Sequence, residues 1–277
     1  MKRRSFLDKS LVGLGAMCIV PQVFTQTNNT LFDTPEYRKI WKEWKKCCSD
    51  PVYFIEKYCV IKTPYHEEAR RFKLTPQQKS VVSDLQKHTY NIFKKSRQIG
   101  MSYILIAYAL WKNIFTFYPH NILFVSYNRQ SAQYLSSVYS YMFDNLVQFK
   151  PQKKEWNKLE KIHNSGMGGS TSCIKFSSFS NVERAAHSQS FNLEIYDEFA
   201  FSETPILNKS RNIIITSTPS GNNNYFYKIW KGKNIFNKRT ITRGPVNFNS
   251  NNYSNRRRYI KLLGNKSYKQ EILAKFV

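Results

Sequence analysis

The sequence predicts an α/β fold: a mainly parallel β-sheet flanked by helices, with a small helical region in front of it. Between residues 90 and 146, apolar segments of strand length alternate with segments of helical periodicity. This order is typical of parallel sheets whose strands are joined by crossover helices. Two further apolar strand-length segments follow, around residues 195 and 214. With 277 residues the chain can bury a full core, so one large domain with appendages is expected.

Helices are expected wherever apolar and aromatic residues recur at helical spacing. Asp50 and Thr75 each stand directly before a proline, and a capping side chain followed by Pro is typical of a helix start. The expected helices are Pro35–Cys48, Pro51–Tyr58, Pro76–His88, Ser102–Phe115, Arg129–Leu146, Tyr225–Lys231, Tyr253–Leu263 and Tyr268–Phe276.

Strands are expected at short apolar or alternating runs. These runs are Tyr90–Phe93, Asn121–Ser126, Ser172–Ser177, Phe191–Glu198 and Arg211–Pro219. The run Ser172–Ser177 alternates polar and apolar residues, which indicates an exposed or edge strand. Two segments are expected to be loops: Pro151–Gly169 is basic and then Gly-rich, and Asn247–Asn255 is rich in Asn and Ser.

The chain is strongly basic, with a formal net charge of +25 from 43 Lys and Arg against 18 Asp and Glu. Such an excess favours a polyanionic partner, with nucleic acid as the leading candidate and an anionic membrane as the second. A compositionally biased genome is the alternative explanation, because Asn and Lys are frequent. The charge is also uneven: beyond Glu203, Glu271 is the only acidic residue against fifteen Lys and Arg.

The cysteines and the N-terminus point to different compartments. Five cysteines without a C-x-x-C pair indicate neither a disulfide framework nor a zinc site, which favours a reducing compartment. The basic start Lys2–Leu7, followed by the apolar run Leu11–Val23, looks like a twin-arginine export signal. The run is too short for a membrane span, and no A-x-A cleavage site follows. An amphipathic helix and an unrelated upstream extension are the alternatives.

The stretch Lys94–Ser102 lies between an expected strand and an expected helix and contains a Gly and a Ser. In this context backbone N–H groups and the helix dipole can hold a phosphate. The usual phosphate loop is G-x-x-x-x-G-K-[ST]. Aligned on Gly100 and Ser102, the first Gly position holds Lys95 and the Lys position holds Met101. The stretch therefore has a lysine at the wrong end, and an ordinary basic turn is the alternative.

Two later strands end in residues that suit the same chemistry. Asp197 and Glu198 end an apolar strand, where an Asp can orient magnesium and the next Glu can polarise the attacking water. Ser217 and Thr218 end the following strand, where hydroxyls can sense a γ-phosphate. Taken singly, the first pair could be a solvated acidic end and the second a Ser/Thr-Pro turn. Their joint order after a phosphate loop favours a nucleoside triphosphatase.

With these motifs in order, the chain resembles the ATPase half of the large terminase subunit of tailed bacteriophages, the motor that packages DNA into proheads. Such a domain is a P-loop NTPase of the RecA/ASCE kind. The segments that carry the resemblance are DPVYFIEKY from Asp50, FKLTPQQ from Phe72, KSRQIGMS from Lys95, ILFVSYNRQSA from Ile122, EIYDEFAF from Glu194, IIITSTPSG from Ile213 and GNKSYKQEILAKF from Gly264.

The resemblance implies roles for individual residues. Many family members carry their phosphate-loop lysine at the start of the loop, so Lys95 would reach the β- and γ-phosphates. Arg97 would stabilise the γ-phosphate, Glu198 would be the catalytic base, and Arg184 would act within or between subunits. The rest of the implied site comprises Gln78 at the adenine, Ser96, Gln98, Gly100 and Met101 in the ATP-binding loop, Ser102 and Asp197 on Mg²⁺, and Ser217 and Thr218 in coupling.

The sequence also departs from the family. Full-length members carry a nuclease domain that needs a carboxylate cluster for two metals, and beyond Glu203 only Glu271 is acidic. No nuclease activity is expected from this chain, so the gene would be split or the chain a truncated remnant. The interval from Glu198 to Ile213 is short for the family. The expected division is an N-terminal extension at 1–34, an ATPase domain at 35–245 with a helical subregion at 35–70, and a basic tail at 246–277.

The resemblance implies an ATP-hydrolysing motor subunit that uses ATP and Mg²⁺ to drive double-stranded DNA into proheads. Expected partners are double-stranded DNA, further copies in a homo-oligomeric ring on the portal protein, the small terminase subunit and, if the gene is split, a separately encoded nuclease domain. The ATP chemistry requires the cytoplasm of a bacterial host, which argues against export. The alternatives are a non-enzymatic basic DNA-binding remnant, a helicase fragment that lacks its second RecA-like domain, and an exported basic protein.

Overall fold

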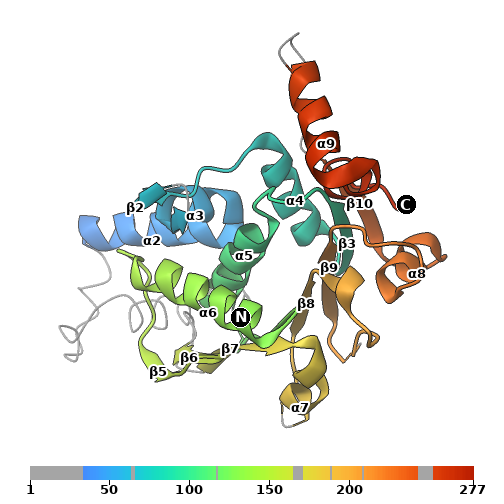
Figure 1. The fold of residues 1–277 in the computed structure, drawn as a ribbon. Coiled ribbons are helices and arrows are strands. Elements are labelled where there is room, and N and C mark those ends of the chain that lie inside the picture. Colours follow the sequence, from blue (N-terminus) through green and yellow to red (C-terminus); the bar gives the residue numbers. More distant parts are fainter. Residues whose placement is uncertain are drawn as a thin grey trace. The chain divides into compact units, whose positions relative to one another are not determined.

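The computed structural model describes residues 34–63, 66–116, 118–164, 171–187, 189–207, 209–242 and 252–277 (Figure 1). The export-like start and the apolar run Leu11–Val23 lie outside the described residues, as does most of the expected loop Asn247–Asn255. Among the described residues, no helix combines the length and hydropathy that crossing a membrane requires.

Eight strands form one mainly parallel sheet in the order β10-β3-β9-β8-β4-β7-β6-β5. Its strands are β3 (Tyr90–Lys95), β4 (Asn121–Ser126), β5 (Lys153–Trp156), β6 (Glu160–Asn164), β7 (Thr171–Ser178), β8 (Leu193–Asp197), β9 (Asn212–Ser217) and β10 (Asn237–Ile241). The pairs β10–β3, β3–β9 and β8–β9 are parallel, whereas β5–β6 and β6–β7 are antiparallel. The predicted α/β fold class is confirmed.

The described residues fall into two compact units. Unit 1 contains the residues up to Val82, Tyr103–Ile122 and Gln133–Lys175. Unit 2 contains Ser83–Ser102, Leu123–Ala132 and Phe176–Val277. Several elements, such as α4 (Pro76–Lys87), α5 (Met101–Phe115) and α6 (Arg129–Asp144), contribute residues to both.

Unit 1 is built on aromatic packing. Its N-terminal helices are α2 (Pro35–Ser49) and α3 (Pro51–Tyr58), followed by a hairpin of β1 (Val60–Thr63) and β2 (His66–Arg71). The rings of Trp44 and Phe54 lie 4.6 and 5.0 Å from that of Phe115 on α5. The predicted caps are confirmed, since Asp50 Oδ1 accepts from Tyr53 N at 2.9 Å and Thr75 Oγ1 from Gln78 N at 3.3 Å.

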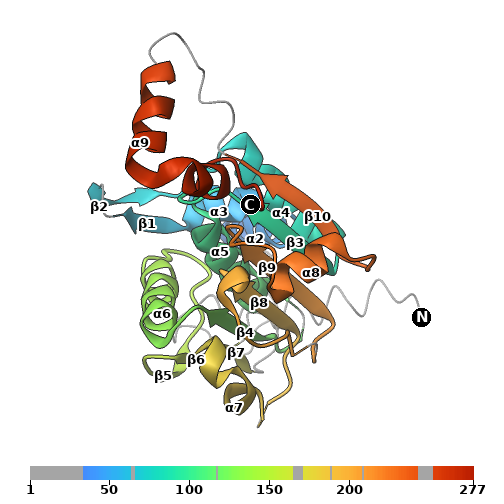
Figure 2. The ribbon, with the colours of Figure 1, turned by 45° about the vertical axis from the view of Figure 1, so that its right-hand side comes forward.

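Unit 2 carries the strands β10, β3, β9 and β8, which Figure 2 shows side by side. Its buried core joins apolar side chains of these strands to those of neighbouring helices and loops: Ile92, Leu123, Val125, Tyr196, Phe199, Ile213, Ile215 and Phe226. The helices of this unit are α7 (Val182–Ala186), α8 (Tyr225–Lys231) and α9 (Asn252–Glu271). Gly264 breaks α9 with a φ of +77°, as expected between two short helices. The second predicted helix, Tyr268–Phe276, is wrong beyond Glu271, because the chain leaves the helix there.

Two expectations in the region 151–177 are wrong. The expected loop Pro151–Gly169 contains the antiparallel strands β5 and β6. On β6 the buried side chains are the polar Lys161 and His163, so the buried face of this strand has no apolar pattern to predict it. The run Ser172–Ser177 is neither exposed nor at an edge, because β7 lies between β4 and β6 and is largely buried.

The short interval between β8 and β9 does not disturb the sheet. The two strands pair directly in parallel, from Leu193 beside Asn212 to Asp197 beside Thr216. Their connection is anchored by two buried side chains of β8. Tyr196 Oη accepts a hydrogen bond from Leu207 N at 2.9 Å, and Glu194 Oε1 accepts one from Lys209 N at 2.9 Å.

Candidate nucleotide-binding site

Three predicted motifs meet at one edge of unit 2. The phosphate-loop segment follows β3, Asp197 and Glu198 end β8, and Ser217 and Thr218 end β9. Because β3, β9 and β8 are parallel neighbours, their carboxyl ends lie together at the edge where open α/β sheets bind ligands. The structure therefore brings together side chains that stand far apart in the sequence, such as Lys95 and Glu198.

Lys95 ends β3 and is buried, with a close ion pair between its Nζ and Glu198 Oε1. Its side chain is 5% exposed and that of Glu198 is 29% exposed. Glu198 adopts a left-handed backbone conformation with a φ of 58°, which is rare for a residue with a side chain. Its second oxygen, Oε2, accepts a hydrogen bond from Thr218 N at 3.2 Å. The lysine predicted for the phosphates and the predicted base thus contact each other.

Ser102 and Asp197 form the second contact of the site. Ser102 Oγ donates to Asp197 Oδ2 at 2.5 Å, and Asp197 is 3% exposed. The other oxygen, Oδ1, is buried and has no hydrogen-bond partner among the described residues. Burial raises the pKa of Asp197 to about 6, while the Lys95 ammonium acts in the opposite direction. A buried carboxylate oxygen without a partner beside a hydroxyl is the donor set that Mg²⁺ takes in nucleotide sites.

No cluster of three or more His, Cys, Asp or Glu side chains that could hold a metal occurs among the described residues. A magnesium ion at Ser102 and Asp197 would therefore depend on phosphate oxygens and water for its remaining ligands, as magnesium in phosphoryl-transfer sites commonly does. The two side chains fit that arrangement.

Ser217 and Thr218, at the end of β9, contact Glu198 and the turn that follows it. Ser217 Oγ accepts from Ala200 N at 3.0 Å and lies 3.4 Å from Glu198 Oε2. Thr218 Oγ1 is buried and has no hydrogen-bond partner among the described residues. A shift of the Glu198 carboxylate would therefore change contacts both at the end of β9 and in the turn that contains Ala200.

The loop between β3 and α5 has two residues with positive φ, Gln98 at 59° and Gly100 at 74°. Met101 starts α5, and the residue is 2% exposed. This burial explains why the loop tolerates Met where the usual motif has Lys. Lys95, which is predicted to supply the lysine charge, ends β3 at the other end of the loop.

Contacts with the C-terminal segment were not predicted from the sequence. Ser96 N donates to Ile241 O at 2.9 Å, and Ser96 Oγ donates to Ile272 O at 2.5 Å. Arg97 N donates to Glu271 O at 2.8 Å, and its guanidinium lies 3.3 Å from Glu271 Oε1. The only sequence signal for this docking is that Glu271 is the one acidic residue after Glu203.

Two further predicted site residues lie on other elements. Gln78 belongs to unit 1, where its Oε1 accepts from Thr75 N at 2.9 Å and completes a reciprocal cap of α4. Arg184 lies exposed on α7 and makes no ion pair with a described residue. The roles predicted for these two residues stay predictions.

Solved structures with this fold include large terminases of bacteriophages. The ATPase domain of the large terminase of Thermus phage P74-26 superposes with a TM-score of 0.59 at 15% identity, covering 74% of this chain and 95% of that one. The large terminase of bacteriophage HK97 gives a TM-score of 0.53 at 16% identity, covering 66% and 40%. The large terminase of a thermophilic bacteriophage, in complex with ADP, gives a TM-score of 0.53 at 12% identity, covering 73% and 53%.

This chain has the fold of a large terminase ATPase domain. At these identities the likeness concerns the fold alone, and no family model matches the sequence. The chain spans about half or less of the HK97 terminase and of the ADP-bound terminase, but nearly all of the P74-26 ATPase domain. The terminase ATPase fold places the ends of β3, β8 and β9 together, where Lys95, Asp197 and Glu198 gather.

Proposed function

We propose that this chain is the ATP-hydrolysing motor module of a phage or prophage terminase, which drives double-stranded DNA into proheads. The observation that carries this proposal is the cluster of Lys95, Ser102, Asp197, Glu198 and Thr218 at the carboxyl ends of three parallel strands. The terminase ATPase fold and the charge of +25 support it. The proposed setting is the bacterial cytoplasm, in a homo-oligomeric ring on the portal protein, with the small terminase subunit as a partner.

The proposed mechanism starts from the ion pair between Lys95 and Glu198. When ATP enters, the Lys95 ammonium exchanges the Glu198 carboxylate for the β- and γ-phosphate oxygens, which are also anionic. Glu198 is then free to accept a hydrogen bond from the attacking water and to take its proton. The buried lysine therefore has two alternative anionic partners, and nucleotide binding selects between them.

Ser102 and Asp197 would hold magnesium, which supplies charge neutralisation at the phosphate oxygens. Arg97 would leave Glu271 to stabilise charge on the γ-phosphate. Once the γ-phosphate has left, Glu198 returns to Lys95 and again accepts from Thr218 N. This hydrogen bond would pass the state of the nucleotide to β9 and to the segment beyond it.

The test is a steady-state ATPase assay with and without double-stranded DNA and with and without EDTA. We expect Mg²⁺-dependent hydrolysis that DNA stimulates and EDTA abolishes. DNA binding without any hydrolysis would instead identify a non-enzymatic remnant. Hydrolysis that DNA leaves unchanged would contradict the coupling to translocation.

A further inference from the structure

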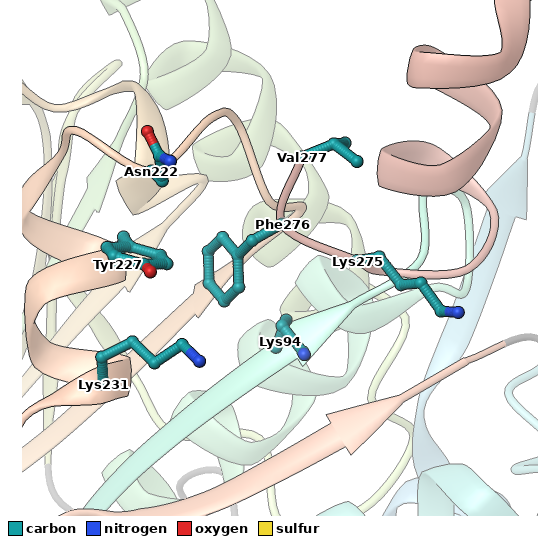
Figure 3. A pocket seen from close by; sticks show the side chains of 7 residues that line it. All are labelled: Lys94, Asn222, Tyr227, Lys231, Lys275, Phe276 and Val277. Atoms are coloured by element: carbon teal, nitrogen blue, oxygen red, sulfur yellow. The ribbon is translucent and has the colours of Figure 1, made fainter.

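Unit 2 contains a second cationic site, a pocket of about 340 Å³ that Lys94 of β3 helps to line (Figure 3). Successive side chains of a strand point to opposite faces, so Lys94 and Lys95 serve different sites. We call this second site the Lys94 pocket. It is lined by Lys94, Asn222, Tyr227, Lys231, Lys275, Phe276 and Val277.

Three lysines line this pocket, and none of them forms an ion pair with a described residue. None of the ion pairs among the described residues involves Lys94, Lys231 or Lys275. The one acidic residue in the chain beyond Glu203 is Glu271, and its carboxylate lies beside Arg97. The pocket therefore has a net positive charge that an anion would reduce.

Lys94 is the most enclosed of the three lysines. Its Nζ lies 4.9 Å from the ring centre of Trp230 and 5.2 Å from that of Phe276. Burial and the nearby charges of Lys231 and Lys275 lower the pKa of Lys94. An anion bound in the pocket would offset this effect. Lys231 and Lys275 are exposed, so they can move to meet such a group.

The walls of the pocket are well supported. The ring of Phe276 lies 4.8 Å from that of Tyr227 in an edge-to-face arrangement, and Figure 3 shows it between Tyr227 and Lys94. Asn224 caps α8 by accepting from Tyr227 N at 2.9 Å. The lysines therefore project from a strand, a helix and a packed segment, and the pocket exists without a ligand.

We propose that the Lys94 pocket binds a backbone phosphate of double-stranded DNA. Lysine ammonium groups are point charges that bind phosphate without reading sequence, and the chain's charge of +25 suits a polyanion better than a single small anion. The inference rests on the proposed function for the identity of the polyanion, but not on hydrolysis. The pocket also follows Ser217 and Thr218 closely in the chain, through Asn222 and α8, so the DNA contact adjoins the segment that would sense the nucleotide.

The test uses the full chain with Lys231 and Lys275 both changed to Gln, and a fluorescein-labelled duplex of about 30 base pairs. Fluorescence anisotropy between about 50 and 200 mM salt gives the slope of log affinity against log salt concentration. We expect the slope of the variant to be smaller by about 1, because the pocket binds one phosphate. The matched control changes Lys228 and Lys233 to Gln, since both are exposed, lie on or just after α8 and do not line the pocket.

An equal loss of slope in both double variants would overturn the proposal, because it would mean diffuse attraction. An unchanged slope in the pocket variant would also overturn it. Calorimetric titration with inorganic phosphate tests whether the pocket binds the free anion instead of DNA. If the pocket variant loses phosphate binding but keeps the salt slope for DNA, the pocket is a site for the free anion. If the wild type hydrolyses no ATP but the slope falls only in the pocket variant, the motor proposal fails and the DNA contact stands.

Discussion

Glu198 is the most unusual residue of the candidate site. A left-handed φ of 58° costs a residue with a side chain about 1–2 kcal/mol, and the hydrogen bond from Thr218 N and the pair with Lys95 offset this cost. The conformation turns the chain sharply at the end of β8, so that Asp197 and Glu198 point to different partners. In the proposed mechanism, Asp197 faces magnesium and Glu198 faces the attacking water.

Lys95 gives the first prediction. Changing Lys95 to Ala removes the buried ammonium that faces the phosphates, and we expect ATP affinity to fall by about tenfold or more, since a charge-assisted hydrogen bond contributes about 1.5–3 kcal/mol. Titration with a fluorescent ATP analogue measures the change. Lys94→Ala is the matched control, because its side chain points to the other pocket. If Lys94→Ala weakened ATP binding and Lys95→Ala did not, the loop lysine would be misassigned.

At the residue scale, the order of motifs along the chain predicted the group formed by Lys95, Ser102, Asp197 and Glu198. Its geometry follows from the parallel sheet, which carries strand ends to one edge. The docking of Ser96 on Ile241 and Ile272 could not be predicted, because the acceptors are backbone carbonyls and any residue type offers one. The pairing of Arg97 with Glu271 depends on how α9 ends, which the sequence does not indicate.

Variants of the residues that cap helix α4 test the predicted adenine contact of Gln78. Gln78 and Thr75 cap this helix together, so either change to Ala is expected to cost about 1 kcal/mol of unfolding free energy. Only Gln78→Ala is expected to weaken ATP binding as well, while leaving inorganic triphosphate binding unchanged. Thermal denaturation and competition binding measure the two effects. Equal ATP affinity in both variants would limit Gln78 to the cap.

His163, on strand β6, is expected to make the stability of the protein depend on pH. Burial lowers the pKa of His163 to about 4, below its value of 6.5 in an unfolded chain. The unfolded state therefore binds the proton first, and stability is full above pH 6.5 and falls as the pH drops toward 4. Between pH 7 and 5 we expect a loss of about 2 kcal/mol from this residue, measured by urea denaturation. In His163→Gln the loss should be smaller by that amount, and an identical loss would contradict the assignment.

At the element scale, predictability followed the apolar pattern. The strands β3, β4, β8 and β9 were predicted because they are short apolar runs that the sheet buries. Strand β10, with the sequence NKRTI, was missed because it pairs with β3 through its backbone and carries mostly polar side chains at the edge of the sheet. Polar strands of this kind are specified by their neighbours rather than by their own residues.

At the scale of the whole molecule, the fold class was predicted correctly, and solved terminase structures share it. The division into an extension at 1–34, a domain at 35–245 and a tail at 246–277 stays a prediction, as do the partners in the packaging machine. The strong positive charge leads to a prediction about how the whole chain binds DNA. DNA affinity should fall steeply with salt, and the slope counts the phosphates that the chain contacts.

The central claim is that Glu198 activates the water that attacks ATP. The most direct test measures ATP binding and ATP turnover in Glu198→Gln, with Glu203→Gln as the control, since Glu203 is exposed and close in the chain. We expect turnover in Glu198→Gln to fall by about 10²–10⁴-fold while ATP binds at least as tightly, because Lys95 loses its competing carboxylate. Unchanged turnover in Glu198→Gln, or an equal loss in Glu203→Gln, would contradict the account.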